Sequence, residues 1–236
     1  MSNKMRPKEP ARQLTFDLAG DPCFGIEDFF VSESNENAYA MLELWPDWPD
    51  SVLLLRGPAG AGKSHLGAIW AARAGARILT ARDFAAERDL ESLARSGPLL
   101  IEDADAIGEA EASLFHLLNL VRHHHHALVL TARRAPDFWG LRIADLLSRL
   151  RLAPVAAIEP PDEDLMRAIL VKLFLDRQLV VDTGLIEHAA LHLDRSFEAA
   201  RDFVERLDRE ALARGARITK SLAGTVLQSL IPPETE

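Results

Sequence analysis

Short apolar runs alternate with helix-like segments over the first two thirds of the chain. The runs cover residues 52–55, 77–79, 99–101, 128–130 and 155–158. Between them, apolar residues recur every three or four positions, most clearly at Leu114, Leu117, Leu118 and Val121. Continuous apolar strands that alternate with helices form parallel sheets covered on both faces. This pattern therefore predicts an α/β core with a five-stranded parallel sheet covered by helices.

The pattern changes after Pro160, where helical periodicity takes over. Asp162 is suited to cap a helix, and Glu163 suits its first turn. The candidate elements beyond it are helices near residues 183–193, 196–214 and 219–229, and a strand at 179–181. We therefore expect an α/β domain over residues 24–159 and a small helical domain over residues 160–230.

Composition and charge narrow the class of protein. Of the 236 residues, 48% are apolar and 27% are charged, which is typical of globular domains. The net charge of −9 argues against strong binding to duplex DNA, since neutralising phosphates requires clustered Lys and Arg. The single cysteine, Cys23, excludes an internal disulfide, and no apolar run approaches the roughly 18 residues of a membrane span. We expect a cytoplasmic protein with no membrane partner, and disordered tails at residues 1–12 and 231–236.

A phosphate-binding loop follows the first apolar run. Its pattern, Gly-x-x-x-x-Gly-Lys-Ser, is matched by Gly57, Pro58, Ala59, Gly60, Ala61, Gly62, Lys63 and Ser64, and His65 then begins a helical segment. Backbone N–H groups of such a loop surround phosphate oxygens, and the helix directs its positive end at them. Lys63 is expected to reach the β- and γ-phosphates, and Ser64 to bind Mg²⁺. The alternative is a chance glycine-rich turn, but a strand before the loop and a helix after it favour the first interpretation.

Two carboxylates end the third apolar run. Glu102 and Asp103 directly follow Leu99-Leu100-Ile101. A loop that binds nucleotide phosphates needs acidic groups nearby to hold the metal and position water. We assign Glu102 to the metal and Asp103 to the polarisation of water, and the alternative is a solvated strand end.

These segments together resemble the DnaA-like AAA+ family, and most closely its Hda branch of small regulatory homologues of the replication initiator DnaA. The resemblance extends over about residues 24–230. It implies that ADP or ATP is bound with Mg²⁺, and that Phe30 and Val31 contact the adenine. Thr131 matches the polar sensor at the end of a strand, and Arg149, within Asp-Leu-Leu-Ser-Arg-Leu, matches an arginine finger.

The sequence departs from the family pattern at two places. The family has an acidic residue two positions after the sensor, where this chain has Arg133. An ungapped alignment places Glu198 where the family has a lid arginine, and Arg195 lies one turn earlier. The second departure, the missing lid arginine, favours a regulatory state with bound ADP over a fast ATPase.

A short segment near the N-terminus resembles the peptide with which replication proteins bind the sliding clamp of DNA polymerase. It consists of Gln13, Leu14, Thr15, Phe16, Asp17 and Leu18. Glutamine supplies hydrogen bonds, the three apolar side chains fill pockets, and such a peptide becomes ordered on binding. The alternative is an alternating edge strand of the domain.

The sequence supports three functions to different degrees. The first is a clamp-bound regulator that stimulates hydrolysis of DnaA-bound ATP and so prevents over-initiation of replication. Its partners are DnaA and the clamp, it meets DNA only indirectly through the clamp, and a homo-oligomer is compatible with it. The alternatives are a DnaC-like helicase-loader ATPase and a non-hydrolysing AAA+ adaptor.

Other conspicuous residues are expected to have structural roles. A metal site is not favoured at His123-His124-His125-His126, because consecutive side chains on a helix end diverge and no cysteine or carboxylate follows at ligand spacing. Packing is expected for Trp45, Trp48, Phe138 and Trp139, and a solvated helix start for Glu109 and Glu111.

Overall fold

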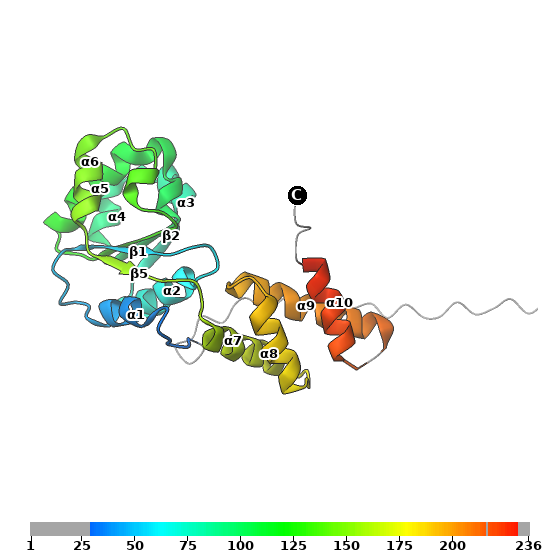
Figure 1. Cartoon of the computed structure of the whole chain (residues 1–236). Coiled ribbons are helices and arrows are strands. Elements are labelled where there is room, and N and C mark those ends of the chain that lie inside the picture. The colour runs from blue at the N-terminus through cyan, green and yellow to red at the C-terminus, as the bar shows by residue number, and fades with distance from the viewer. Residues whose placement is uncertain (1–28, 216, 231–236) are drawn as a thin grey trace, which may run out of the picture.

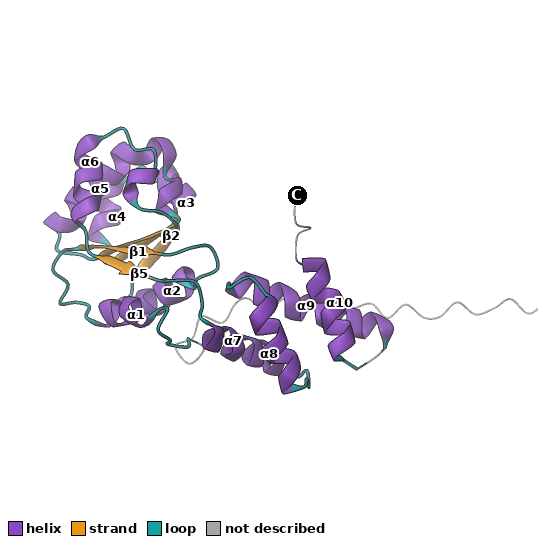
Figure 2. Ribbon diagram, in the orientation of Figure 1, coloured by secondary structure: helices purple, strands orange, loops and turns teal. Residues whose placement is uncertain are grey.

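A five-stranded parallel sheet forms the centre of the larger part of the molecule (Figures 1 and 2). The computed structural model describes residues 29–215 and 217–230. The strands are β1 Val52–Arg56, β2 Arg77–Thr80, β3 Leu99–Glu102, β4 Leu128–Ala132 and β5 Val155–Ala157. Their order across the sheet is β2-β3-β4-β1-β5, and every neighbouring pair is parallel. The predicted α/β core with five parallel strands is confirmed.

Helices cover both faces of the sheet because alternate strand residues point to opposite sides. On one face Leu53 and Leu55 pack against α1 (Glu36–Glu43) and α2 (Lys63–Ala74). On the other, Val52 and Leu54 belong to a cluster with the remaining core helices. These are α3 Ala81–Ala86, α4 Leu90–Arg95, α5 Glu111–His123 and α6 Ala144–Leu152, with short 3₁₀ turns at Ala104–Ala106, Gly108–Ala110 and Pro136–Phe138. The predicted helical set from Leu114 to Val121 lies fully buried on this face.

A tryptophan cluster supports the middle of α2. Trp70 is 2% exposed, and its ring stacks on Trp48 at 5.5 Å between centroids. Trp45 meets it edge-on at 6.3 Å. The expected packing of the loop before β1 is therefore confirmed, and it fixes the helix that begins at the phosphate-binding loop.

Four helices form the second part of the molecule, which we call the lid. They are α7 Glu163–Asp176, α8 Thr183–His192, α9 Phe197–Arg214 and α10 Lys220–Leu230. Their buried apolar faces form a cluster separate from those of the core. Each begins at a side-chain cap, since Asp162, Asp182, Ser196 and Thr219 each accept a backbone N–H of the first turn. No helix in the described part of the chain is long and apolar enough to cross a membrane.

Three local predictions are wrong. Residues 179–181 form a loop, because Leu179 packs into the lid's helical cluster and finds no neighbouring strand. Phe138 is 66% exposed, whereas the adjacent Trp139 is packed as expected. Glu111 is buried rather than solvated, since its carboxylate accepts hydrogen bonds from the backbone of Arg142 and Ile143.

The lid is joined to the core through the segment before α1. The backbone N–H of Glu159 donates to the carbonyl oxygen of Ser34 at 2.8 Å. Burial alone would raise the pKa of the Asp162 carboxyl, but hydrogen bonds from Leu165, Ser32 and Ser34 hold it below its usual range. The cap of α7 therefore also contacts the core.

Candidate nucleotide site

The phosphate-binding loop lies between the end of β1 and the start of α2. Gly60 and Gly62 have φ angles of +68° and +96°, in the left-handed region that favours glycine. Lys63 opens α2 and is 7% exposed. Its ammonium group donates to the carbonyl oxygens of Gly57 at 2.8 Å and of Pro58 at 2.7 Å. The loop therefore curls around the lysine at the N-terminal end of the helix.

Gly57 anchors the loop to the strands on both sides of β1. Its N–H donates to the carbonyl oxygen of Ala132, at the end of β4, at 3.1 Å. On the other side, a Cβ at Gly57 would lie 2.5 Å from the carbonyl oxygen of Ile158, just after β5. Only glycine permits this approach, so the loop has little freedom to shift along the sheet edge.

The acidic strand end is joined to the neighbouring strand by Thr131. Asp103 follows β3 with a left-handed backbone, φ 52° and ψ 43°. Its N–H donates to the Thr131 hydroxyl at 2.9 Å, and Thr131 is 1% exposed. Three residues selected from the sequence, Thr131, Asp103 and Glu102 at the end of β3, therefore meet at one sheet edge.

Charged groups surround the lysine of the loop. Burial lowers the pKa of Lys63, and the positive charge of Arg133 lowers it further. The carboxylates of Asp103, Asp105 and Glu102 act in the opposite direction. A cation and several carboxylates therefore share the space in front of the loop.

The lid contacts the loop directly. The backbone N–H of Phe197, the first residue of α9, donates to the carbonyl oxygen of Gly60 at 2.9 Å. A Cβ at Gly60 would lie 2.7 Å from the Cβ of Ser196. The rings of Phe197 and Phe29 come within 3.7 and 4.0 Å of the corresponding position on Gly62. The N-terminal end of α9 thus closes one side of the site.

The segment that resembles the family's adenine-contacting stretch passes beside the phosphate-binding loop through Phe29. Phe30 and Val31 are exposed at 36% and 52%, and the Asn35 amide donates to the Phe30 carbonyl oxygen at 2.9 Å. Phe29 is half-buried and meets the His65 ring edge-on, with centroids 5.3 Å apart. Phe29 opens the segment whose resemblance predicted an adenine contact, whereas sequence reasoning missed Phe197 because that contact comes from the lid.

These residues suit an adenine nucleotide with Mg²⁺. The left-handed Gly60 and Gly62 let the backbone turn around Lys63, which supplies a cation. Ser64 is exposed in the first turn of α2, and Glu102 is half-buried at the strand end. Mg²⁺ on nucleotides commonly takes one or two protein oxygens together with phosphates and water, so Ser64 and Glu102 would hold it.

Arg149 belongs to a different surface. It lies on α6, where its guanidinium donates to the Asn119 side chain and sits 4.8 Å from the centre of the Phe115 ring. Both partners lie on α5. Because α6 runs from the end of β4 to the start of β5, its second half approaches the sheet edge opposite the phosphate-binding loop. Arg149 therefore lies away from the nucleotide site of its own chain.

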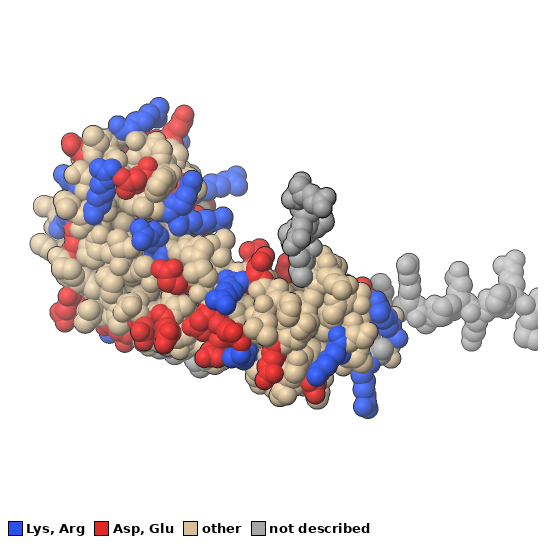
Figure 3. Space-filling model, in the orientation of Figure 1, with Lys and Arg blue, Asp and Glu red and all other residues tan. Residues whose placement is uncertain are grey.

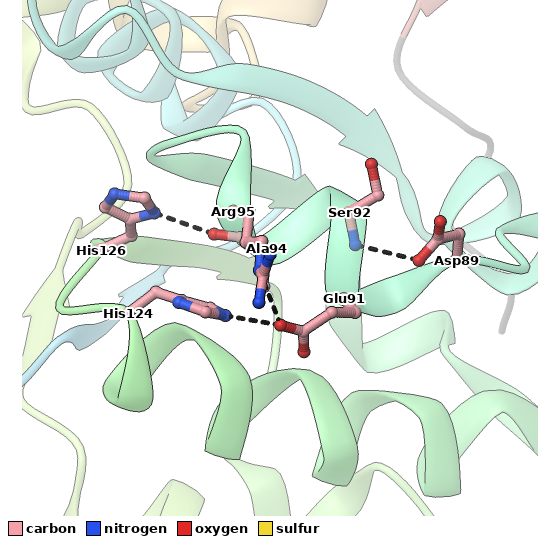
Figure 4. A network of polar contacts seen from close by, with 7 residues as sticks. All are labelled: Asp89, Glu91, Ser92, Ala94, Arg95, His124 and His126. Carbon is pink, nitrogen blue, oxygen red and sulfur yellow. Dashed lines mark hydrogen bonds and ion pairs between the residues drawn. The ribbon is translucent and has the colours of Figure 1, made fainter.

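The histidine run ties α4 to the turn after α5 (Figure 4). The His124 ring lies 3.0 Å from the Glu91 carboxylate, which also accepts from Arg95 at 2.8 Å. His126 contacts the carbonyl oxygen of Ala94 at 2.8 Å. These two histidines therefore have a structural role, as expected from the sequence.

Comparison with solved structures identifies this architecture. Domain III of the Thermotoga maritima replication initiation protein DnaA superposes with a TM-score of 0.79 at 22% identity, covering 90% of this chain and 99% of that one. The chain has the AAA+ fold. AMPPCP-bound DnaA from Aquifex aeolicus is a further neighbour, with a TM-score of 0.69, 18% identity and coverage of 83% of this chain and 71% of that one.

Sequence comparison points to the same AAA+ proteins. The chromosomal replication initiator protein DnaA of Limosilactobacillus reuteri is 24% identical over 253 residues, which cover 97% of this chain and 58% of the relative. The chain thus spans a little over half the length of such relatives. No family profile matches the sequence. The predicted clamp peptide, residues 13–18, lies outside the described residues, as do the two predicted tails.

Proposed function

We propose that this protein is an adenine-nucleotide-binding regulator of the Hda type. It binds ADP or ATP with Mg²⁺, docks on the sliding clamp of DNA polymerase, and stimulates hydrolysis of ATP held by DnaA. This activity would prevent over-initiation of chromosome replication in the cytoplasm. The AAA+ module occupies residues 24–159 and 160–230 as two domains.

The phosphate-binding loop supports the nucleotide part of this proposal. Lys63 lies inside the loop, and the carboxylates of Glu102 and Asp103 face it from β3. The Thr131 hydroxyl accepts the backbone N–H of Asp103 and so fixes the position from which the Asp103 side chain extends. The similarity to AMPPCP-bound DnaA supports an adenine nucleotide as the ligand.

The position of Arg149 is the observation that carries the regulatory part. A finger that serves the nucleotide of a neighbouring protein must lie away from its own site and be held in a defined direction. Arg149 meets both conditions, since Asn119 and Phe115 hold its guanidinium on α5. An arginine delivered to the γ-phosphate of another protomer stabilises the charge that develops as ATP is hydrolysed. DnaA is the proposed recipient.

Hydrolysis by the chain itself is proposed to be slow. The first turn of α9 contacts the loop and carries Glu198, and the nearest arginines in sequence are Arg195 and Arg201. A carboxylate at this end of the lid cannot offset the charge of a γ-phosphate. The acidic chain is also proposed to meet DNA only through the clamp.

The proposal is tested by single-turnover hydrolysis of ATP pre-bound to DnaA, in the presence of clamp loaded on DNA. The Arg149→Ala variant is expected to lose stimulation by a factor of about 10³ or more, as with other fingers supplied in trans. Arg151→Ala is the matched control, because Arg151 lies on the same helix and is exposed but pairs with Asp137. Stimulation by Arg149→Ala at the wild-type rate would refute the finger.

A further inference from the structure

Arg133 lies at the mouth of the phosphate-binding loop, and its backbone is held on both sides. The preceding residue, Ala132, accepts the Gly57 N–H through its carbonyl oxygen at 3.1 Å. The N–H of Arg133 donates to the Asp105 carboxylate at 3.2 Å. The chain at Arg133 therefore bridges the loop after β1 and the acidic turn after β3.

The Arg133 side chain is exposed and forms no hydrogen bond or ion pair within residues 29–215 and 217–230. Its charge nevertheless acts on Lys63, as do those of Asp103, Asp105 and Glu102. The guanidinium thus shares the space in front of the loop with these groups. Figure 3 shows basic side chains on the right-hand side of the core as well as on its left and top, although the net charge is −9.

Bound nucleotide would need positive charge in this space beyond that of Lys63 and the Mg²⁺ assigned to Ser64 and Glu102. Three carboxylates, of Glu102, Asp103 and Asp105, face Lys63, and each added phosphate brings more negative charge. The nearest part of the lid supplies no cation, since the Phe197 N–H already donates to the Gly60 carbonyl oxygen and the first turn of α9 carries the acidic Glu198. A guanidinium remains charged at neutral pH and matches two phosphate oxygens with its planar fork.

We infer that Arg133 binds the terminal phosphate of a nucleoside triphosphate from the core side, and so distinguishes ATP from ADP. This inference rests on the proposed nucleotide site. The end of β4 and the Asp105 carboxylate fix the backbone of Arg133, and the unpaired guanidinium turns to the phosphate when ATP is bound. Lys63 and the glycine turns hold the phosphates that both nucleotides share.

Calorimetric titration of the full chain with ADP and with AMPPCP, each with Mg²⁺, tests this assignment. Arg133→Ala is expected to weaken AMPPCP binding by about tenfold or more, because a hydrogen-bonded charge pair is lost, and to change ADP binding by less than about twofold. Arg133→Lys is expected to recover part of the AMPPCP affinity. Arg134→Ala is the matched control, because Arg134 is the next residue along the chain and its side chain is exposed. The Trp139 indole N–H donates to the backbone carbonyl oxygen of Arg134, and the substitution leaves this bond in place.

Unchanged AMPPCP affinity in Arg133→Ala would overturn the inference, and so would an equal loss of affinity for both nucleotides. If the proposed nucleotide site itself is wrong, the result differs, because the wild-type chain would then bind neither nucleotide. Each variant is expected to unfold at the same temperature as wild type. The two backbone hydrogen bonds at positions 132 and 133 do not depend on the side chain at position 133.

Discussion

Thr131 holds the turn that carries Asp103. Its buried hydroxyl accepts the N–H of Asp103, a residue whose backbone lies in the left-handed region. Residues other than glycine rarely adopt this conformation, although aspartate tolerates it better than most. The hydrogen bond between β4 and the turn after β3 therefore stabilises the direction in which the Asp103 carboxylate leaves the strand.

Replacing Thr131 tests this role. Thr131→Val removes the acceptor and is expected to lower the free energy of unfolding by about 0.5–1.5 kcal/mol. The carboxylate also becomes less well positioned, so metal-dependent nucleotide affinity is expected to fall with it. Thr131→Ser keeps the hydroxyl and serves as the control in denaturant unfolding and titration. Equal stability of the valine and serine variants would show that the bond contributes nothing.

Lys63 is the residue on which nucleotide binding depends most directly. Lys63→Ala is expected to abolish measurable binding of both ADP and ATP in isothermal titration, because the cation inside the loop is lost. The fold is expected to survive, since the lysine bonds only to carbonyl oxygens of its own loop. If a folded Lys63→Ala variant bound ADP and ATP with wild-type affinity, the loop would not be part of the nucleotide site.

Residues with a local pattern were accessible from the sequence, and residues placed by tertiary contacts were not. The loop from Gly57 to Ser64 follows the full spacing that is typical of a phosphate-binding turn. Phe197 enters the site because α9 folds back on the loop, some 140 residues along the chain. Asn119 likewise holds Arg149 across two helices. No spacing in the sequence encodes such contacts.

At the scale of elements, Glu111 connects α5 to the start of α6. Its carboxylate accepts the N–H groups of Arg142 at 2.7 Å and Ile143 at 3.2 Å, just before α6 begins at Ala144. These backbone bonds, with the guanidinium of Arg142, hold the pKa of Glu111 below its usual range. The start of the helix that carries Arg149 is thereby fixed to the helix that carries its partners.

This connection predicts a pH-dependent contribution to stability. Because the folded-state pKa of Glu111 is lowered, its stabilising effect is complete above the unfolded value of about 4.3 and is lost as the pH falls through the folded value. Glu111→Gln is expected to melt at a lower temperature than wild type at pH 7, and the difference should shrink towards pH 3. A difference that stays constant with pH would contradict this assignment. Glu109→Gln, at an exposed position two residues earlier, is the control.

The clamp peptide is an element whose role remains a prediction. Replacing Gln13, Leu14 and Phe16 with Ala removes one polar anchor and two pocket-filling side chains. A micromolar contact corresponds to about 8 kcal/mol, so losing several kcal/mol makes it undetectable. Binding of the full chain to purified clamp by surface plasmon resonance would measure the loss. Full-strength binding by the triple variant would show that residues 13–18 do not bind the clamp.

Element types were well predicted wherever periodicity was long or strands were wholly apolar. The five strands match within two residues at either end, because buried parallel strands read as continuous apolar runs. The error at residues 179–181 has the opposite cause. A short apolar run is ambiguous by pattern alone, and only the lid helices determine that Leu179 packs as a loop residue.

At the scale of the whole molecule, Asp162 couples the lid to the core. It caps α7 by accepting the Leu165 N–H at 2.8 Å, and it also bonds with Ser32 and Ser34 of the core. Asp162→Ala is expected to cost about 0.5–2 kcal/mol as a lost cap and to loosen the junction in addition. Asp182→Ala removes a comparable cap inside the lid, at the start of α8.

Limited proteolysis separates these two effects. Cleavage near residues 159–162 is expected to accelerate in Asp162→Ala and to remain slow in Asp182→Ala, although both variants are less stable than wild type. Equal cleavage rates at this junction would show that Asp162 acts only as a helix cap. Bound nucleotide is expected to slow cleavage in both, because the lid contacts the loop through Phe197 and Gly60.

The tryptophan cluster gives the protein its own optical probe. Trp70 lies two turns after Lys63 on α2, within an apolar environment shared with Trp48 and Trp45, and its indole N–H has no partner in the described part of the chain. Ring stacking makes its fluorescence sensitive to small displacements of the helix. Trp139 packs on the opposite face of the sheet. In a Trp139→Phe variant, all tryptophan fluorescence would therefore come from Trp45, Trp48 and Trp70. Occupancy of the phosphate-binding loop would then be visible as a change in light emission, without any attached dye.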